Sequence, residues 1–243
     1  MNTSCAIVLA GGLGKRMKSD LPKPAHHVGG KSMLQHVVDK LNVDKIFIVF
    51  GQKGDQLKAS IKHQENIIWV HQDPQLGTGH AVQVAFQEVK RHYTSDVQIL
   101  VCNGDAPFIR EKTFQELFSN KQNYGTLLTC VVQNPHGYGR IEMKDNQFWR
   151  IVEEKDCNDN QRLIKNINAG AYCFTYEALD KYIMTLKDNN AQKEFYLTDM
   201  MGILVENNHP VGVVEINDEN EIFNINSREQ LEEANKLFTS FSA

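Results

Sequence analysis

The sequence has 243 residues, of which 41% are hydrophobic and 23% charged, and its formal net charge is -4. These values are ordinary for a globular domain and give no reason to expect nucleic-acid binding. No apolar run reaches the ~20 residues of a membrane span, and no basic segment of a signal peptide precedes the first apolar run. The five cysteines lack C-x-x-C spacing, which favours buried thiols in a reducing cytoplasm.

The first predicted strand, Ala6–Ala10, is apolar throughout and ends at Gly11-Gly12-Leu13-Gly14. Basic residues then follow within a dozen positions: Lys15, Arg16, Lys18 and Lys23. Glycines let backbone N–H groups approach a ligand closely, and cations complement phosphate charge. The stretch therefore predicts a loop that binds a phosphorylated ligand, most simply a nucleoside triphosphate.

Two other phosphate motifs fit this stretch less well. A dinucleotide-binding loop reads G-x-G-x-x-G, and Met17 occupies its last glycine position when the pattern starts at Gly12. A P-loop reads G-x-x-x-x-G-K-[ST]. Gly30-Lys31-Ser32 supplies its end, but Ala25 stands at its first glycine. From the loop alone, an ordinary glycine turn with surface lysines stays open.

Strand-like and helix-like patterns alternate through the first half of the chain. The expected strands are 45–50, 67–70 and 97–102, and the expected helices are 33–41, 54–63 and one with Thr78 as N-cap. This alternation predicts an α/β fold with a Rossmann-like, mostly parallel sheet flanked by helices. Such sheets bind ligands beyond the carboxyl ends of their strands.

Two of these carboxyl ends are followed by side chains that can bind a ligand. After the third strand, the amide of Gln72 can pair with the edge of uracil, and Gly77 leaves room for a ligand. After the fourth strand, Asn103-Gly104-Asp105 brings a carboxylate that can reach a divalent cation. A glycine-softened helix cap and an ordinary turn explain the same residues without a ligand, and both alternatives stay open here.

The second half is richer in strands. The expected elements are a strand at 126–132, a hairpin of 141–143 and 148–151 around Asp145-Asn146, a strand at 166–174, a helix from 199 to about 207, a strand at 211–216 and a last helix capped by Ser227. Gly170 indicates a bulge or a close ligand. The β-rich part suits a sugar, because Gly139, Glu153 and Asn168 supply backbone, carboxylate and amide groups.

L-A-G-G-L-G-K-R-M followed by L-P-K-P resembles the opening of the sugar-phosphate nucleotidylyltransferases. Q-L-G-T-G-H-A, at 75–81, is characteristic of the N-acetylglucosamine-1-phosphate uridyltransferase branch, the pyrophosphorylase half of a bifunctional bacterial enzyme. G-Y-G-R-I, I-V-E-E-K-D and E-F-Y-L-T-D follow in the family's order, so the resemblance covers about 4–238. It implies cytoplasmic synthesis of UDP-N-acetylglucosamine and pyrophosphate from UTP and N-acetylglucosamine 1-phosphate. Homo-oligomerisation stays open.

The resemblance also implies the roles of individual residues. The catalytic residues are expected to be Arg16, Lys23 and Asp105, with Mg²⁺ held by Asp105 and Asn226. The nucleotide-binding residues are expected to be Leu9, Ala10, Gly11, Gly12, Lys23, Gln72, Gly77, Thr78, Asn103, Gly104 and Asp105. The sugar-binding residues are expected to be Gly139, Glu153, Asn168, Tyr196 and Thr198. One nucleotidyltransferase domain is expected, with 1–133 and 196–243 as its nucleotide-binding core and 134–195 as its sugar-binding lobe.

The sequence departs from the family pattern at three positions. Lys15 replaces Thr or Ser, Asn103 replaces Tyr, and Ala169 replaces Thr, which is expected to loosen sugar selectivity. The left-handed β-helix acetyltransferase domain of the bifunctional enzyme is expected to be absent. Another sugar 1-phosphate, thymine in place of uracil, and a non-catalytic nucleotide-sugar-binding module stay open as alternatives.

Overall fold

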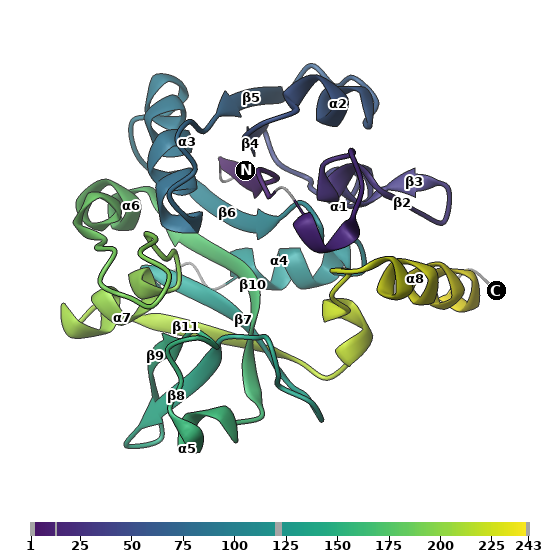
Figure 1. Ribbon diagram of the computed structural model, residues 1–243. Coiled ribbons are helices and arrows are strands. Elements are labelled where there is room, and N and C mark those ends of the chain that lie inside the picture. Colours follow the sequence, from purple (N-terminus) through teal and green to yellow (C-terminus); the bar gives the residue numbers. More distant parts are fainter. Residues whose placement is uncertain (1–2, 13, 120–122, 242–243) are drawn as a thin grey trace.

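The computed structural model describes residues 3–12, 14–119 and 123–241 (Figure 1). Its main strands are β1 (Ser4–Leu9), β4 (Lys45–Phe50), β5 (Ile67–His71), β6 (Gln98–Asn103), β7 (Gly125–Val131), β10 (Asn166–Thr175) and β11 (Val211–Ile216). They form one sheet in the order β11-β7-β10-β6-β1-β4-β5. β1 pairs in parallel with β4 and β6, and β10 runs antiparallel between β6 and β7. The predicted mostly parallel α/β fold is confirmed.

The central strands are apolar throughout because helices cover both faces of the sheet. The helices are α1 (Met33–Val38), α2 (Gly54–Ala59), α3 (Thr78–His92), α4 (Glu111–Ser119), α5 (Asp159–Arg162), α6 (Tyr176–Tyr182), α7 (Asp199–Glu206) and α8 (Arg228–Phe241). Ile7 of β1 packs into a core with α3, α6 and α7, whereas its neighbour Val8 packs with α1, α2 and α4. Successive side chains of a strand point to opposite faces of the sheet, so they pack into two separate hydrophobic cores.

Short elements complete the chain. They are the 3₁₀ turns η1 (Lys15–Met17), η2 (Lys23–Ala25), η3 (Ile183–Thr185) and η4 (Glu219–Ile222), and the small ribbon of β2 (His27–Val28) and β3 (Lys31–Ser32). A third core joins this ribbon to α8 through Val28, Ile225 and Ala234. The C-terminal helix thereby lies beside the segment that follows the glycine loop (Figure 1).

Helix ends test the predicted caps. The Oγ of Ser32 accepts the N–H of Gln35 at the start of α1, and the Oγ of Ser227 accepts that of Gln230 at the start of α8, as predicted. Thr78 is not an N-cap. Gly77 occupies that position with φ 112°, and the Thr78 hydroxyl instead accepts the N–H of Leu197 at 3.0 Å. The helix expected over 54–63 ends at Ala59.

The predicted hairpin is present as β8 (Arg140–Lys144) and β9 (Gln147–Val152). Asp145 and Asn146 both have positive φ, as a two-residue hairpin turn requires. β8 pairs with the start of β10, so the hairpin extends from the main sheet, whereas the rest of β10 runs through the sheet's centre. The register of β10 shifts between Asn168 and Tyr172, around Gly170 at φ 73°. This is the bulge that the glycine indicated.

The five cysteines are all buried and free. Across the described ranges, no helix combines the length and the apolar character that crossing a membrane requires.

Candidate active site

Two cavities lie side by side at the carboxyl ends of β1 and β6. The glycine-loop cavity, of about 360 Å³, is lined by Gly11, Gly12, Gln72 and Gly77 among others. The lobe cavity, of about 210 Å³, is lined by Gly139, Glu153, Asn168 and Thr198 among others. Both cavities share Leu9, Thr78, Asn103, Asp105 and Asn224. Because these parallel strands end at one edge of the sheet, their following loops meet there.

Lys23, Asp105 and Asn226 converge at this edge from three distant segments. The Nζ of Lys23, on η2, lies 2.6 Å from Oδ2 of Asp105 and donates a hydrogen bond of 2.8 Å to Oδ1 of Asn226. The side chains of Lys23 and Asp105 are only 12% and 26% exposed, so the pair is shielded from solvent screening. One positive centre therefore bridges the two oxygens that the sequence proposed as metal ligands.

This arrangement fits a divalent cation. A carboxylate oxygen and an amide oxygen are hard donors of the kind that Mg²⁺ prefers, and both already face one cationic centre. The described residues contain no group of three His, Cys, Asp or Glu side chains with metal-binding geometry. A cation here would complete its shell with waters and with the phosphates of a ligand, which is how Mg²⁺ is usually held beside nucleotides.

The glycine-loop cavity contains most of the residues expected at the nucleotide. The Nε2 of Gln72 donates to the Gly77 carbonyl at 3.0 Å and lies 3.1 Å from Nδ1 of His80. Lys23 lines neither cavity and reaches the site through Asp105. Ala10 and Gly104 also line neither cavity. Their N–H groups bond to Val49 and Leu9, so they hold the neighbouring loops together instead. The loops named from the sequence therefore line this cavity, but not every residue named in them faces it.

Arg16 does not join this cluster. It lies on η1 with an exposed side chain and forms no ion pair with the described carboxylates. The guanidinium of Arg228 fixes the end of η1 by donating to the carbonyls of Met17, at 3.1 Å, and Lys18, at 2.6 Å. Leu13 and the side chain of Lys15 lie outside the described part of the structure.

The lobe cavity is built around Glu153. The Thr198 hydroxyl donates to Oε1 of Glu153 at 2.9 Å. Burial raises the pKa of Glu153, and this hydrogen bond lowers it by a smaller amount. Asn168 is fixed in turn, because its amide donates to the Tyr172 hydroxyl at 2.6 Å and accepts the N–H of Gly170 at 3.1 Å. These groups present a preformed polar surface.

Tyr196 does not line the lobe cavity, contrary to the expectation that it lines the sugar end. It lines a neighbouring cavity of about 520 Å³, here called the acidic cavity, together with Asp156, Asp199 and Glu206. Glu153 separates the two spaces and lines both. Burial, followed by the charges of Glu153 and Asp156, raises the pKa of Asp199 to about 6.

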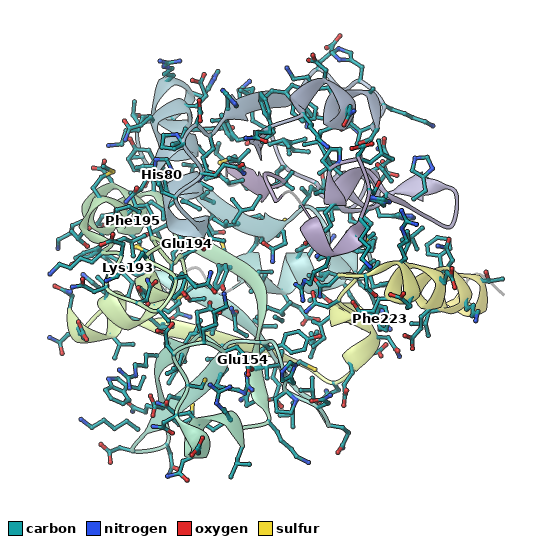
Figure 2. All side chains as sticks on the ribbon, viewed as in Figure 1. His80, Glu154, Lys193, Glu194, Phe195 and Phe223 are labelled. Carbon is teal, nitrogen blue, oxygen red and sulfur yellow. The ribbon has the colours of Figure 1, made fainter. Side chains whose placement is uncertain are left out.

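Sequence reasoning missed several residues that line the cavities, namely Gln75, Tyr138, Tyr172, Glu194 and Asn224. Gln75 belongs to the quoted motif, and its Nε2 donates to the Gly11 carbonyl at 2.5 Å. Figure 2 labels Glu194 and Phe195 on the chain beside His80 of α3. The rings of His80 and Phe195 have their centroids 6.4 Å apart. Only contacts between distant segments bring these side chains to the site.

A family model described as MobA-like NTP transferase domain matches residues 6–195. The chain belongs to this family. Its relatives include proteins named "Bifunctional protein GlmU" from Clostridium botulinum, Clostridium kluyveri and Legionella pneumophila. They are 40%, 42% and 39% identical to the chain over 96%, 96% and 98% of its length. The chain spans about half the length of these relatives, 51% or 52%.

The fold also resembles a solved structure from Bacillus anthracis, described as a glucose-1-phosphate thymidylyltransferase in complex with a sucrose. The two share a TM-score of 0.74, and the match covers 97% of this chain and 95% of that one. At 21% identity, this likeness shows the fold alone. The fold and the GlmU-type resemblance that the sequence indicated are thus confirmed.

Proposed function

We propose that the protein is a Mg²⁺-dependent uridylyltransferase that makes UDP-N-acetylglucosamine and pyrophosphate from UTP and N-acetylglucosamine 1-phosphate. The observation that carries the proposal is the Lys23–Asp105–Asn226 cluster, in which Asp105 lines both cavities. A charge cluster between two ligand spaces is what phosphoryl chemistry between two substrates needs, because the reacting phosphates meet there. The relatives named GlmU support the same assignment.

In this proposal UTP lies in the glycine-loop cavity. The Gln72 side chain pairs with uracil through its amide, exchanging its present bond to the Gly77 carbonyl for one to the base. Lys23 holds the triphosphate, and Arg16, which is exposed and unpaired among the described residues, closes onto the leaving pyrophosphate. Gly11 and Gly12 bring backbone close to the phosphates.

The sugar 1-phosphate lies in the lobe cavity. Glu153 accepts hydrogen bonds from sugar hydroxyls, while the amide of Asn168 and the backbone at Gly139 contact the remaining polar groups. Thr198 keeps the Glu153 carboxylate oriented. The two substrates then meet at Asp105, which lines both cavities.

The reaction needs no protein nucleophile. An oxygen of the sugar phosphate attacks the α-phosphorus of UTP in line, a new P–O bond forms, and the bond to the pyrophosphate oxygen breaks. The attacking phosphate is already ionised, so no general base is required. Asp105 and Asn226 would hold Mg²⁺, which supplies neutralisation of the charge on the phosphates. The chain contributes positioning and cationic side chains.

The test is to incubate the protein with UTP, Mg²⁺ and a panel of sugar 1-phosphates, and to follow pyrophosphate. The proposal expects release with N-acetylglucosamine 1-phosphate above glucose and N-acetylgalactosamine 1-phosphates, and with UTP above dTTP. A preference for another sugar or for dTTP would correct the substrate assignment. No release with any pair, while UDP-N-acetylglucosamine still binds, would favour a non-catalytic binding module.

A further inference from the structure

A buried carboxylate ties together the two segments that carry Asp105 and Asn226. Glu221, on η4, is only 4% exposed. Its Oε2 accepts the Arg110 N–H at 3.1 Å and the Thr113 hydroxyl at 2.6 Å, both at the start of α4. The Arg110 guanidinium lies 3.5 Å from its Oε1. A charge buried to this extent is tolerated only with such partners.

A second cation, Lys40 in the turn after α1, holds the same segment. The Nζ of Lys40 donates to the carbonyls of Pro107, at 2.6 Å, and Ile109, at 2.8 Å. Burial lowers the pKa of Lys40 to about 8, although the charge of Glu221 opposes the shift. The chain between β6 and α4 is therefore held at both of its ends, by β6 itself and by the Lys40–Glu221 network.

The tied segments form one wall of the lobe cavity. Ala106 and Ile109 line it from the β6 side, and Ile222, Phe223 and Asn224 line it from the η4 side. The Tyr138 hydroxyl also donates to the Ile222 carbonyl at 3.1 Å, which anchors η4 to the lobe. Figure 2 labels Phe223 on this segment, between η4 and α8. Asn226 follows two residues after the wall ends.

We propose that Glu221 is a positioning residue that sets the spacing between Asp105 and Asn226 and so the affinity of the cation site between them. It touches neither oxygen directly. It acts by holding Arg110, five residues after Asp105, and Thr113 of α4 against η4, where Glu221 itself lies five residues before Asn226. The inference rests on the cation role given to these two residues under the proposed function.

The experiment compares Glu221→Gln with Asp218→Asn. Both remove a carboxylate beside Arg110, but Asp218 is partly exposed and bonds to the far side of that guanidinium. Binding of Mn²⁺ to the protein in the presence of UTP is followed by water-proton relaxation, which needs no turnover. We expect Glu221→Gln to weaken Mn²⁺ binding by about 10-fold, in the range of lost outer-shell partners, and Asp218→Asn to change it less than about 2-fold.

Two further variants keep the result clear if Glu221→Gln folds poorly. Thr113→Val removes one donor to Oε2 and should weaken Mn²⁺ binding by about 3-fold at an unchanged melting temperature, and Glu221→Asp should restore part of the loss. Equal Mn²⁺ affinity in wild type, Glu221→Gln and Thr113→Val would overturn the proposal, as would wild-type protein that binds no Mn²⁺. Wild-type protein that binds Mn²⁺ and UTP but releases no pyrophosphate would refute the proposed function alone.

Discussion

The glycine-loop cavity and the lobe cavity hold their charged groups in opposite ways. At the border of the glycine-loop cavity, the Lys23 ammonium is neutralised by Asp105. In the lobe cavity, Glu153 is half-buried, and its hydrogen bond comes from a neutral hydroxyl rather than from a described cation. The first arrangement can exchange partners with phosphate at little cost in charge. In the lobe cavity, the Glu153 carboxylate can accept further hydrogen bonds, which sugar hydroxyls can donate.

The same contrast separates groups that must rearrange from groups that are already in place. The amides of Gln72 and Gln75 donate to the backbone carbonyls of Gly77 and Gly11, so a nucleotide has to replace one of these bonds. Asn168 is held on both sides of its amide by the body of β10. We therefore expect substitutions beside the nucleotide to change rate and UTP binding, and substitutions in the lobe to change sugar binding.

The largest effect is expected for Asp105→Ala. It removes an oxygen from the proposed cation site and the partner of Lys23, so pyrophosphate release should fall by at least about 10²–10³-fold. The melting temperature should stay close to that of the wild type, since Asp105 is partly exposed. Asp55→Ala, which removes an exposed carboxylate of α2, serves as the control. Near-normal turnover in Asp105→Ala would refute the metal assignment.

The lobe is tested by Glu153→Gln. Removing the charged acceptor should raise KM for N-acetylglucosamine 1-phosphate by about 10–100-fold, the value of a hydrogen bond to a charged group, with KM for UTP unchanged. Initial-rate kinetics with each substrate varied in turn measure both constants. Glu142→Gln, on the outer part of the hairpin, is the matched control. An equal rise in both KM values would remove the distinction between the two cavities.

A smaller effect is expected for Arg228→Gln. This guanidinium holds η1 through the carbonyls of Met17 and Lys18, and η1 carries Arg16. Losing these bonds should raise KM for UTP by about 5-fold, with KM for the sugar phosphate unchanged. Arg228→Lys keeps the charge but not the two directed bonds, so it should fall between wild type and Arg228→Gln. An unchanged KM for UTP in Arg228→Gln would show that η1 plays no part in UTP binding.

The sequence predicted features that depend on neighbouring residues better than features that depend on contacts between residues far apart in the chain. Local patterns predicted the bounds of β4 and β11 without error, and they also predicted the turn at Asp145-Asn146. This was possible because strand patterns and turn residues are encoded within a few positions. The rule that parallel strands present their carboxyl ends together, with the family resemblance, brought Asp105 and Lys23 to one site. That rule needed only the order of the strands.

Contacts across the chain could not be read in this way. The hydroxyl of Thr78 has the spacing of an N-cap, yet Leu197, which is 119 positions away, takes it as a partner. The motif around Tyr196 gave no sign of which side of Glu153 its ring would occupy. Glu221 reads as one of many acids in a polar stretch, and only the fold shows that it is buried against α4.

The smallest effect concerns stability rather than catalysis. The pKa of Asp199 is raised from 3.8 to about 6, first by burial and then by Glu153 and Asp156. The folded state thus binds more protons than the unfolded state between these values, and stability falls as the pH rises from about 4 to about 6. Asp199→Asn should raise stability at pH 7.5 by on the order of 1 kcal/mol, discounted for partial exposure.

Calorimetric melting of wild type and Asp199→Asn at pH 4 and pH 7.5 checks this sign. The gain should be confined to the higher pH, because at pH 4 the aspartic acid is already protonated in the folded protein. An equal difference at both pH values would mean that packing, and not the charge in the acidic cavity, accounts for it.

The central claim is that Asp105 and Asn226, from two segments far apart in the chain, act on one cation between the two cavities. A double-mutant cycle of Asp105→Asn and Asn226→Ala, read as kcat/KM for pyrophosphate release, tests it most directly. The account predicts that the double variant is far less impaired than the product of the two single effects, with a coupling energy of about 1–3 kcal/mol. Fully additive effects would contradict it, since they would mean that the two side chains act independently.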